Sequence, residues 1–233
     1  MTRMDDLRTA RDILDHVENY QTARLKAQTR RDAGWFHPSS LSNPCDVAMA
    51  LEYMGYSQVN TDPKLFRIFD LGHNRDKAWK SYIDESGLSY SRNDEDLKIC
   101  IEDFRIRGEC DALIEWNGQR YIGEFKTINS NGWSRLHRPK PEHVIQVQAY
   151  MFGHRVRTAL VFYENKDTQE VKILPVPYYK DVWRKVVKRT EHIRAIVDAA
   201  STPQEALDQL ERGCKYQCRY PDECGGICDL SEW

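Results

Sequence analysis

Near the start of the chain, hydrophobic residues return every three or four positions, a spacing that places them on one face of a helix. This spacing predicts a long exposed helix over residues 5–30. Two later helices carry start signals, because a residue that can cap a helix comes directly before a proline at the first helical position. Asn43 and Asp62 are these caps, and they predict helices over residues 44–55 and 63–85.

The centre of the chain changes to the residue types and alternation of strands. We expect strands over residues 97–101, 104–116 and 121–127. Asn117-Gly118 lies between the last two, and this dipeptide favours a tight hairpin turn because both residues tolerate a positive φ. The last two strands should therefore pair antiparallel.

Helices and strands alternate through the rest of the chain. The patterns predict a helix over residues 139–153, a strand pair over 158–164 and 170–176, a long amphipathic helix over 180–200 and a short helix over 203–211. The order is helices, three strands, a helix, two strands and a helix. This order predicts an α/β fold in which helices flank a mixed β-sheet.

The composition is that of a folded globular protein. Of the 233 residues, 40% are hydrophobic and 30% charged, which suits one domain with a small appendage. No stretch approaches the roughly 18 uninterrupted apolar residues of a membrane span, and the first residues lack the apolar run of a signal peptide. We therefore expect no membrane contact and a cytoplasmic location, or the host cytoplasm for a phage-encoded chain.

Charge and cysteine content narrow the possible partners. The chain has 34 Lys and Arg against 36 Asp and Glu, so a nucleic-acid site must be a local basic patch. The chain has seven cysteines, an odd number, and the four that cluster near its C-terminal end favour metal ligation over a disulfide framework. We divide the chain into a helical region over residues 1–95, a core over 96–200 and a Cys-rich segment over 201–233.

Two acidic residues and a lysine fall on the two strands that the hairpin joins. Because side chains alternate along a strand, Glu124 and Lys126 point to one face, and antiparallel pairing can set Asp111 beside them. Carboxylates suit Mg²⁺, and a neighbouring lysine can position the attacking water or stabilise charge on a phosphate. The alternative is a set of surface charges on a solvated sheet face.

Three motifs in this order resemble the RecB-like branch of the PD-(D/E)XK nucleases, which includes CRISPR-associated and phage exonucleases. Residues 108–111 resemble its Gly-x-x-Asp motif, residues 123–127 its Glu-x-Lys motif, and residues 146–150 its Gln-x-x-x-Tyr motif. The resemblance implies a restriction-endonuclease-like fold, with core 96–200 as the nuclease core. It also implies that Gln146 and Tyr150, four apart on one helix face, support catalysis.

The resemblance also implies a set of metal ligands. Asp111, Glu124 and the Phe125 carbonyl are the expected ligands of Mg²⁺ or Mn²⁺. The family's helical Gly-x-x-x-His motif would place a further ligand four residues after Gly72, where this chain has Asp76. A carboxylate suits Mg²⁺ at least as well as imidazole does, so we expect Asp76 rather than His73 to serve.

The cysteines resemble those of relatives that carry an iron–sulfur cluster, which use one early cysteine and three late ones spaced Cys-x2-Cys-x5-Cys. Cys45 matches the early position, and Cys214, Cys218 and Cys224 match the late ones with one extra residue in the first interval. Four thiolates suit a [4Fe-4S] cluster. Cys228 could replace Cys214, or could complete a four-cysteine zinc site that leaves Cys45 out.

Basic and aromatic residues gather between the Lys126 strand and the Gln146 helix. Trp133, Arg135, Arg138 and Lys140 are the candidate DNA contacts, since cations hold phosphates and an aromatic ring stacks on bases. A solvated loop is the equal alternative. A second basic stretch over residues 184–189 is predicted to be the solvent face of a helix.

These observations predict a divalent-metal-dependent DNA exonuclease. Its substrate should be single-stranded DNA or DNA ends, in recombination, repair or phage DNA processing. One alternative is a non-catalytic DNA-binding or assembly subunit of the same fold. Another is a zinc-ribbon interaction protein, in which the late cysteines bind a partner.

Overall fold

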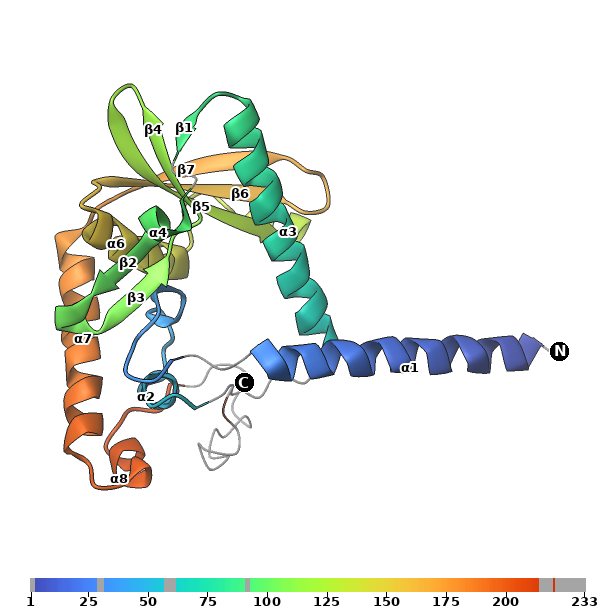
Figure 1. Ribbon diagram of the computed structural model, residues 1–233, viewed down its shortest axis with the longest axis horizontal. Helices are drawn as coiled ribbons and strands as arrows, with labels where there is room; N and C mark the ends of the chain where they lie inside the picture. The colour runs from blue at the N-terminus through green and yellow to red at the C-terminus, as the bar shows by residue number, and fades with distance from the viewer. Residues whose placement is uncertain (1–2, 29–31, 57–61, 91–92, 214–219, 221–233) are drawn as a thin grey trace.

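The computed structural model describes residues 3–28, 32–56, 62–90, 93–213 and 220. Its centre is a five-stranded sheet in the order β1-β4-β5-β6-β7, in which β5 and β6 are parallel and the other neighbours antiparallel (Figure 1). The strands are β1 Ser89–Tyr90, β4 Ala112–Trp116, β5 Gln119–Ile128, β6 Thr158–Asn165 and β7 Val171–Pro177. The predicted α/β class with a mixed sheet is confirmed.

Helices and a small second sheet surround this centre. The longer helices are α1 Arg3–Gln28, α2 Asp46–Tyr53, α3 Pro63–Glu85, α6 Pro141–His154 and α7 Lys180–Ala199. The short ones are η1 Pro38–Ser40, α4 Asp94–Leu97, η2 Glu102–Phe104, α5 Ser130–Ser134 and α8 Pro203–Asp208. β2 Lys98–Ile101 and β3 Ile106–Glu109 pair with each other as a separate two-stranded sheet.

The two faces of the main sheet carry different helices. On one face, Trp79 and Ile83 of α3 pack with Phe125 and Phe162 of the parallel strands. On the other, buried residues of α6 join α2 and α7 in the main core. Because side chains alternate along β5 and β6, residues next to each other in these strands face different helices. The sheet is therefore covered on both sides.

Helix α1 extends away from the rest of the molecule (Figure 1). The C-terminal half of α1 contacts the start of α3. Arg67 of α3 donates to Glu18 and Gln21 of α1 at 3.0 and 2.8 Å. Farther out, Leu7 and Ile13 are exposed, as the sequence predicts. Among the described helices, none has the length and apolar character needed to cross a membrane.

The prediction that a helix starts after Asn43 is wrong by two residues, since α2 begins at Asp46. Asn43 Oδ1 accepts the backbone N–H of Cys45 at 3.0 Å, so this side chain closes a local turn instead of capping the helix. The first amides of α2, at Asp46 and Val47, donate to the carbonyl of Glu211. A distant segment therefore takes the place of a local cap.

The single strand predicted over residues 104–116 is also wrong, because it divides into β3 and β4 in two different sheets. The break comes at Cys110 and Asp111, where the Cys110 amide donates to the carbonyl of Leu97 at 3.0 Å. The hairpin that follows is confirmed. Asn117 and Gly118 have φ values of 52° and 72°, as the tight turn requires.

Candidate active site

Strand β5 places Glu124 and Lys126 side by side on the α6 face of the sheet, with Lys126 Nζ 2.5 Å from Glu124 Oε1. Asp111 joins them from the break between β3 and β4. Its Oδ2 accepts the backbone N–H of Phe125 at 2.7 Å, which fixes the carboxylate between its two partners along β5. The structure thus brings together the three residues that the sequence predicts.

Burial sets the electrostatics of this group. Glu124 is 1% exposed, and burial followed by the charge of Asp111 raises its pKa to about 8. Burial also raises the pKa of Asp111, although Lys126 opposes the shift. Burial lowers the pKa of Lys126, but Glu124 and Asp111 outweigh it and hold that pKa above its usual value. The ammonium therefore keeps its proton next to two carboxyl groups that repel each other.

Helix α3 brings a third carboxyl group to the site. Burial, then the charge of Asp111, raises the pKa of Asp76 to about 6, while Lys126, His73 and Lys80 act in the opposite direction. Asp76 and His73 thus both lie within electrostatic reach of Asp111. His73 is exposed, whereas Asp76 is half-buried. The geometry favours Asp76 as the residue that faces the other carboxylates.

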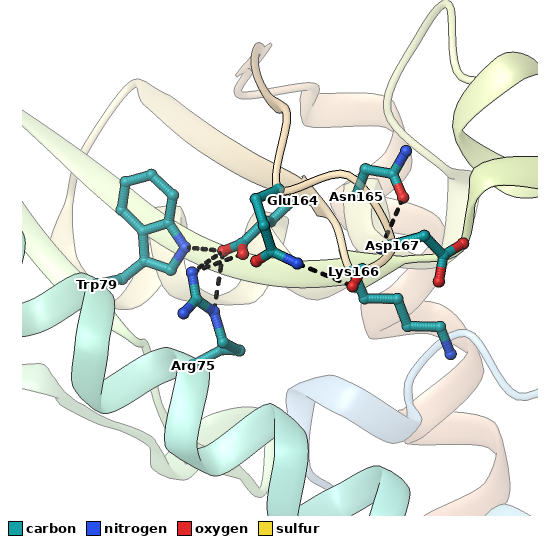
Figure 2. A network of polar contacts seen from close by, with 7 residues as sticks. Arg75, Trp79, Glu164, Asn165, Lys166 and Asp167 are labelled. Atoms are coloured by element: carbon teal, nitrogen blue, oxygen red, sulfur yellow. Dashed lines mark hydrogen bonds and ion pairs between the residues drawn. The ribbon is translucent and has the colours of Figure 1, made fainter.

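An ion pair fixes α3 at this height on the sheet (Figure 2). Arg75, directly before Asp76, donates to Glu164 near the end of β6 through Nη2 at 2.5 and 2.6 Å and Nε at 3.1 Å. Trp79 Nε1 donates to the same carboxylate at 2.9 Å. Glu164 is fully buried, and its partners come from two successive turns of one helix. This cluster was not predicted from the sequence.

Helix α6 contributes the third predicted motif, on the same face of the sheet as Glu124 and Lys126. Gln146 Nε2 donates to the Tyr150 hydroxyl at 3.3 Å, and both side chains are buried. Burial, then Glu124, raises the pKa of Tyr150 well above its usual value, so the phenol stays protonated near the carboxylates. Gly108 makes room for η1, because a Cβ there would lie 2.6 Å from Pro38 Cδ, and it lies next to the Tyr150 ring.

His143, one turn before Gln146 on the same helix face, was missed by the sequence analysis. Its Nδ1 lies 2.7 Å from the hydroxyl of Tyr163, which also accepts the backbone N–H of Lys140 at 2.9 Å. Tyr163 is the register partner of Lys126 on the parallel strand β6. Burial, then Lys126 and Lys140, lowers the pKa of His143 to about 3. The spacing from Gln146 was the available signal.

The residues present fit a divalent cation. Within the described ranges, no group of three or more His, Cys, Asp or Glu side chains is packed closely enough to enclose an ion as it stands. The three carboxyl groups nevertheless gather around one ammonium, and Glu124 Oε2 is buried with no hydrogen-bond partner among the described residues. An unbonded buried oxygen amid excess negative charge is suited to a cation with hard oxygen ligands.

The candidate DNA contacts lie on α5 and the segment that joins it to α6. Trp133 packs against the main core, and Lys172 Nζ stands 4.2 Å from the centre of its ring, so one face of the ring is covered. Arg135 and Arg138 are exposed. Lys140 is half-buried at the entrance to α6, close to His143.

Of the cysteines expected to hold a cluster, Cys45 lies buried at the start of α2. The late cysteines, Cys214, Cys218, Cys224 and Cys228, lie outside the described residues. The chain nevertheless arrives beside Cys45 just before them. A Cβ on Gly213 would collide with the Pro44 carbonyl oxygen and lie 3.5 Å from the Cys45 amide nitrogen.

Comparison with known proteins supports the fold. No family model and no curated protein matches the sequence. The alkaline exonuclease LHK-Exo of Laribacter hongkongensis, crystallised in complex with dAMP, is similar in structure with a TM-score of 0.50 and 15% identity, over 78% of this chain and 93% of that one. Another crystal structure of this exonuclease has a TM-score of 0.48 and 15% identity, over 76% of this chain and 93% of that one. The crystal structure of SSO0001 also has a TM-score of 0.48, with 16% identity, over 82% of this chain and 88% of that one. The mixed sheet with flanking helices is thus a fold that this chain shares with an exonuclease.

Proposed function

We propose that this protein is a divalent-metal-dependent DNA exonuclease of the PD-(D/E)XK type, with its active centre at Asp111, Glu124 and Lys126. The observation that carries the proposal is the buried Glu124 carboxylate, which has Lys126 on one oxygen and no described partner on the other. A structural ion pair would satisfy both oxygens. A Glu124 oxygen left without a hydrogen bond beside Asp111 is suited to bind a divalent metal ion that arrives with the substrate.

Asp76, Asp111 and Glu124, together with the Phe125 carbonyl, would hold Mg²⁺ or Mn²⁺. The bound ion would supply Lewis-acid stabilisation of charge on the scissile phosphate and a more acidic water. Lys126 keeps its proton beside the carboxylates, so its role is to orient the attacking water and to stabilise negative charge as the phosphodiester bond breaks. The hydrogen-bonded pair Gln146 and Tyr150 supports this arrangement from α6.

The choice of DNA as substrate rests on two observations. The solved exonuclease of similar fold was crystallised with dAMP, a deoxynucleotide. Arg135 and Arg138 are exposed on the segment that leads from β5 to α6, where they can meet phosphates. We infer single-stranded DNA or DNA ends as the substrate, in recombination, repair or phage DNA processing.

The decisive experiment incubates the full-length protein with end-labelled single- and double-stranded DNA in Mg²⁺, Mn²⁺ or EDTA. Cleavage should require the metal, and Lys126→Ala or Asp111→Ala should slow it by about 100-fold or more. Lys188→Ala, on the α7 helix, is the matched lysine control and should cleave normally. Full activity of either site variant would refute the assignment, and metal-dependent binding without cleavage would favour a non-catalytic DNA-binding subunit.

We further propose that Cys45 and the late cysteines hold a [4Fe-4S] cluster with a structural role. Gly213 against Pro44 supports this, because it brings the chain next to Cys45 one residue before Cys214. A cluster held between these positions would tie the start of α2 to the segment that follows Gly213. The ligands would be Cys45, Cys214, Cys218 and Cys224, with Cys228 as a possible replacement for Cys214.

Anaerobic purification followed by iron, sulfide and zinc analysis tests this second proposal. An iron–sulfur protein is brown, and Cys45→Ser should lose most of its iron, whereas Cys100→Ser, at an exposed position on β2, should keep it. A colourless protein with one zinc ion that survives Cys45→Ser would instead assign the four late cysteines to a zinc site.

A further inference from the structure

A pocket of about 530 Å³ lies between the N-terminal half of α6 and the first half of α7. Its apolar wall includes Val144 and Ile145 from α6 and Val182 and Val186 from α7. This volume lies within the range of about 300–1,000 Å³ that small-molecule and nucleotide sites occupy. Gln146 and Tyr150, the motif residues of α6, are not among the residues that line this pocket.

Three cationic side chains, Arg138, Lys185 and Arg189, also line this pocket. Arg189 is already engaged, because its Nε donates to Asp46 Oδ1 at 2.6 Å. Arg138 and Lys185 have no ion-pair partner among the described residues. Two cations without ion-pair partners beside an apolar wall fit a ligand that combines an apolar group with negative charge.

The pocket and the candidate active site share one helix. His143 and Gln146 of α6 face the site, while Val144 and Ile145, the residues between them, line the pocket. Because successive residues of a helix are about 100° apart, Val144 and Ile145 point away from His143 and Gln146. The two sites therefore lie on opposite sides of the same helix end, separated by about the 10–12 Å width of a helix with its side chains. Arg138 stands on the segment that enters this helix, and so a strand held at the site can pass over the helix end to the pocket.

We propose that this pocket holds an unpaired nucleotide of the DNA strand whose phosphodiester bond lies at the active site. The apolar wall would receive the base, and Arg138 and Lys185 would contact the adjoining phosphates. This inference rests on the proposed nuclease function and adds a second point of contact on the strand. It also gives a role to Lys185, which the sequence alone placed on a solvent face.

The test measures binding of fluorescent single-stranded oligonucleotides of about 12 nucleotides. Lys126→Ala protein in Mg²⁺ serves as the background, so that the probe is not cleaved. Adding Lys185→Ala or Arg138→Ala should weaken binding by about three- to tenfold. The slope of log K against log salt concentration should become shallower by about 0.7 for each phosphate that the variant no longer binds. Lys188→Ala, one turn further along α7, is the matched control and should change affinity by less than about twofold. Lys185→Arg should restore binding.

Probe length and composition locate the effect. A dinucleotide is too short to reach from the site to the pocket, so its affinity should not respond to Lys185→Ala. Replacing single bases in the longer probe by abasic sites should weaken binding at one position along the strand, the one that enters the pocket. A uniform response at every position, or an equal loss for the dinucleotide, would overturn the pocket assignment.

The outcomes separate this inference from the function on which it rests. Equal affinity of the Lys185→Ala and Lys188→Ala proteins for the longer probe would reject the pocket while leaving the nuclease proposal intact. Wild-type protein that neither binds nor cleaves DNA would reject the nuclease proposal itself. Preferential binding of a poly-glutamate peptide over DNA, lost in Lys185→Ala, would assign the pocket to an acidic protein segment and overturn the nucleotide.

Discussion

Arg75 on α3 and the buried Glu164 on β6 form a partly buried ion pair in which Nη2 lies 2.5 Å from Oε1 and 2.6 Å from Oε2. The pair joins residues 89 positions apart in the chain. It also fixes the residue after Arg75, which is Asp76, at the height of Asp111. The position of a candidate metal ligand is thus set by an ion pair that takes no part in the chemistry.

Arg75→Met should destabilise the protein by about 3–5 kcal/mol, because it leaves the buried Glu164 carboxylate without its cation. Chemical denaturation measures this loss. Arg184→Met is the control, since Arg184 pairs with Asp181 at the surface, with both side chains more than half exposed, and should cost about 1 kcal/mol or less. Equal losses for the two variants would contradict the structural role of the Arg75 pair.

Stability of the metal-free protein should fall as the pH rises from about 4 to about 6. Burial and Asp111 raise the pKa of Asp76 to about 6, above its ordinary value of 3.8, so the folded protein holds a proton in this window that the unfolded chain has lost. Urea unfolding in EDTA at about pH 4.5 and about pH 6.5 measures the slope. Asp76→Asn should make the slope shallower without abolishing it, because Glu124, whose pKa is raised to about 8, adds to the slope in the same window. Mg²⁺ should raise stability at the higher pH. A slope unchanged in Asp76→Asn would show that other groups cause it.

His143 should remain neutral, with its proton on Nε2, down to about pH 4. The Tyr163 hydroxyl accepts a hydrogen bond from the Lys140 amide, so the hydroxyl's own proton is directed towards His143 Nδ1. The ¹⁵N shifts of the imidazole report both tautomer and protonation. Tyr163→Phe should raise the pKa of His143 and mix the tautomers, whereas Phe152→Leu, at an exposed position of α6, should change neither. An Nδ1–H tautomer in the wild-type protein would refute this assignment.

Two glycine substitutions should have opposite effects. Gly213→Ala would press its methyl group against the Pro44 carbonyl oxygen, so it should destabilise the fold and release the C-terminal segment to proteases. Gly72→Ala meets nothing within 4 Å inside α3 and should stabilise the protein by about 0.5–1 kcal/mol. Thermal unfolding and limited proteolysis of both variants check this. Resistance of Gly213→Ala to proteolysis would show that the close approach to Pro44 is dispensable.

Local patterns were enough for most of the fold. The long helices, the Asn117-Gly118 turn and the strand pair β6–β7 each depend on residues close in sequence, and the structure has all of them. The same holds for Glu124 and Lys126, whose common face follows from the alternation of one strand. Their 2.5 Å contact agrees with the expected direction of both side chains.

The features that were mispredicted depend on distant partners. The start of α2 is set by the Glu211 carbonyl, and β3 separates from β4 because the Cys110 amide turns to Leu97. No sequence pattern near Asp46 or Cys110 indicates either contact. The Arg75 cluster and the His143 contact are of the same kind, since Glu164 and Tyr163 lie on a strand far along the chain. Short-range periodicity carries no information about such pairs.

The hydrogen bonds from Asp46 and Val47 to Glu211 have a consequence for how the protein is made. During synthesis, the first turn of α2 leaves the ribosome long before the carbonyl that accepts its amides. The sheet, α3 and α6 can assemble on the emerging chain, but the start of α2 waits for residues near the other end. A nascent chain that stops short of Glu211 therefore lacks the acceptor for the first two amides of α2, directly after Cys45.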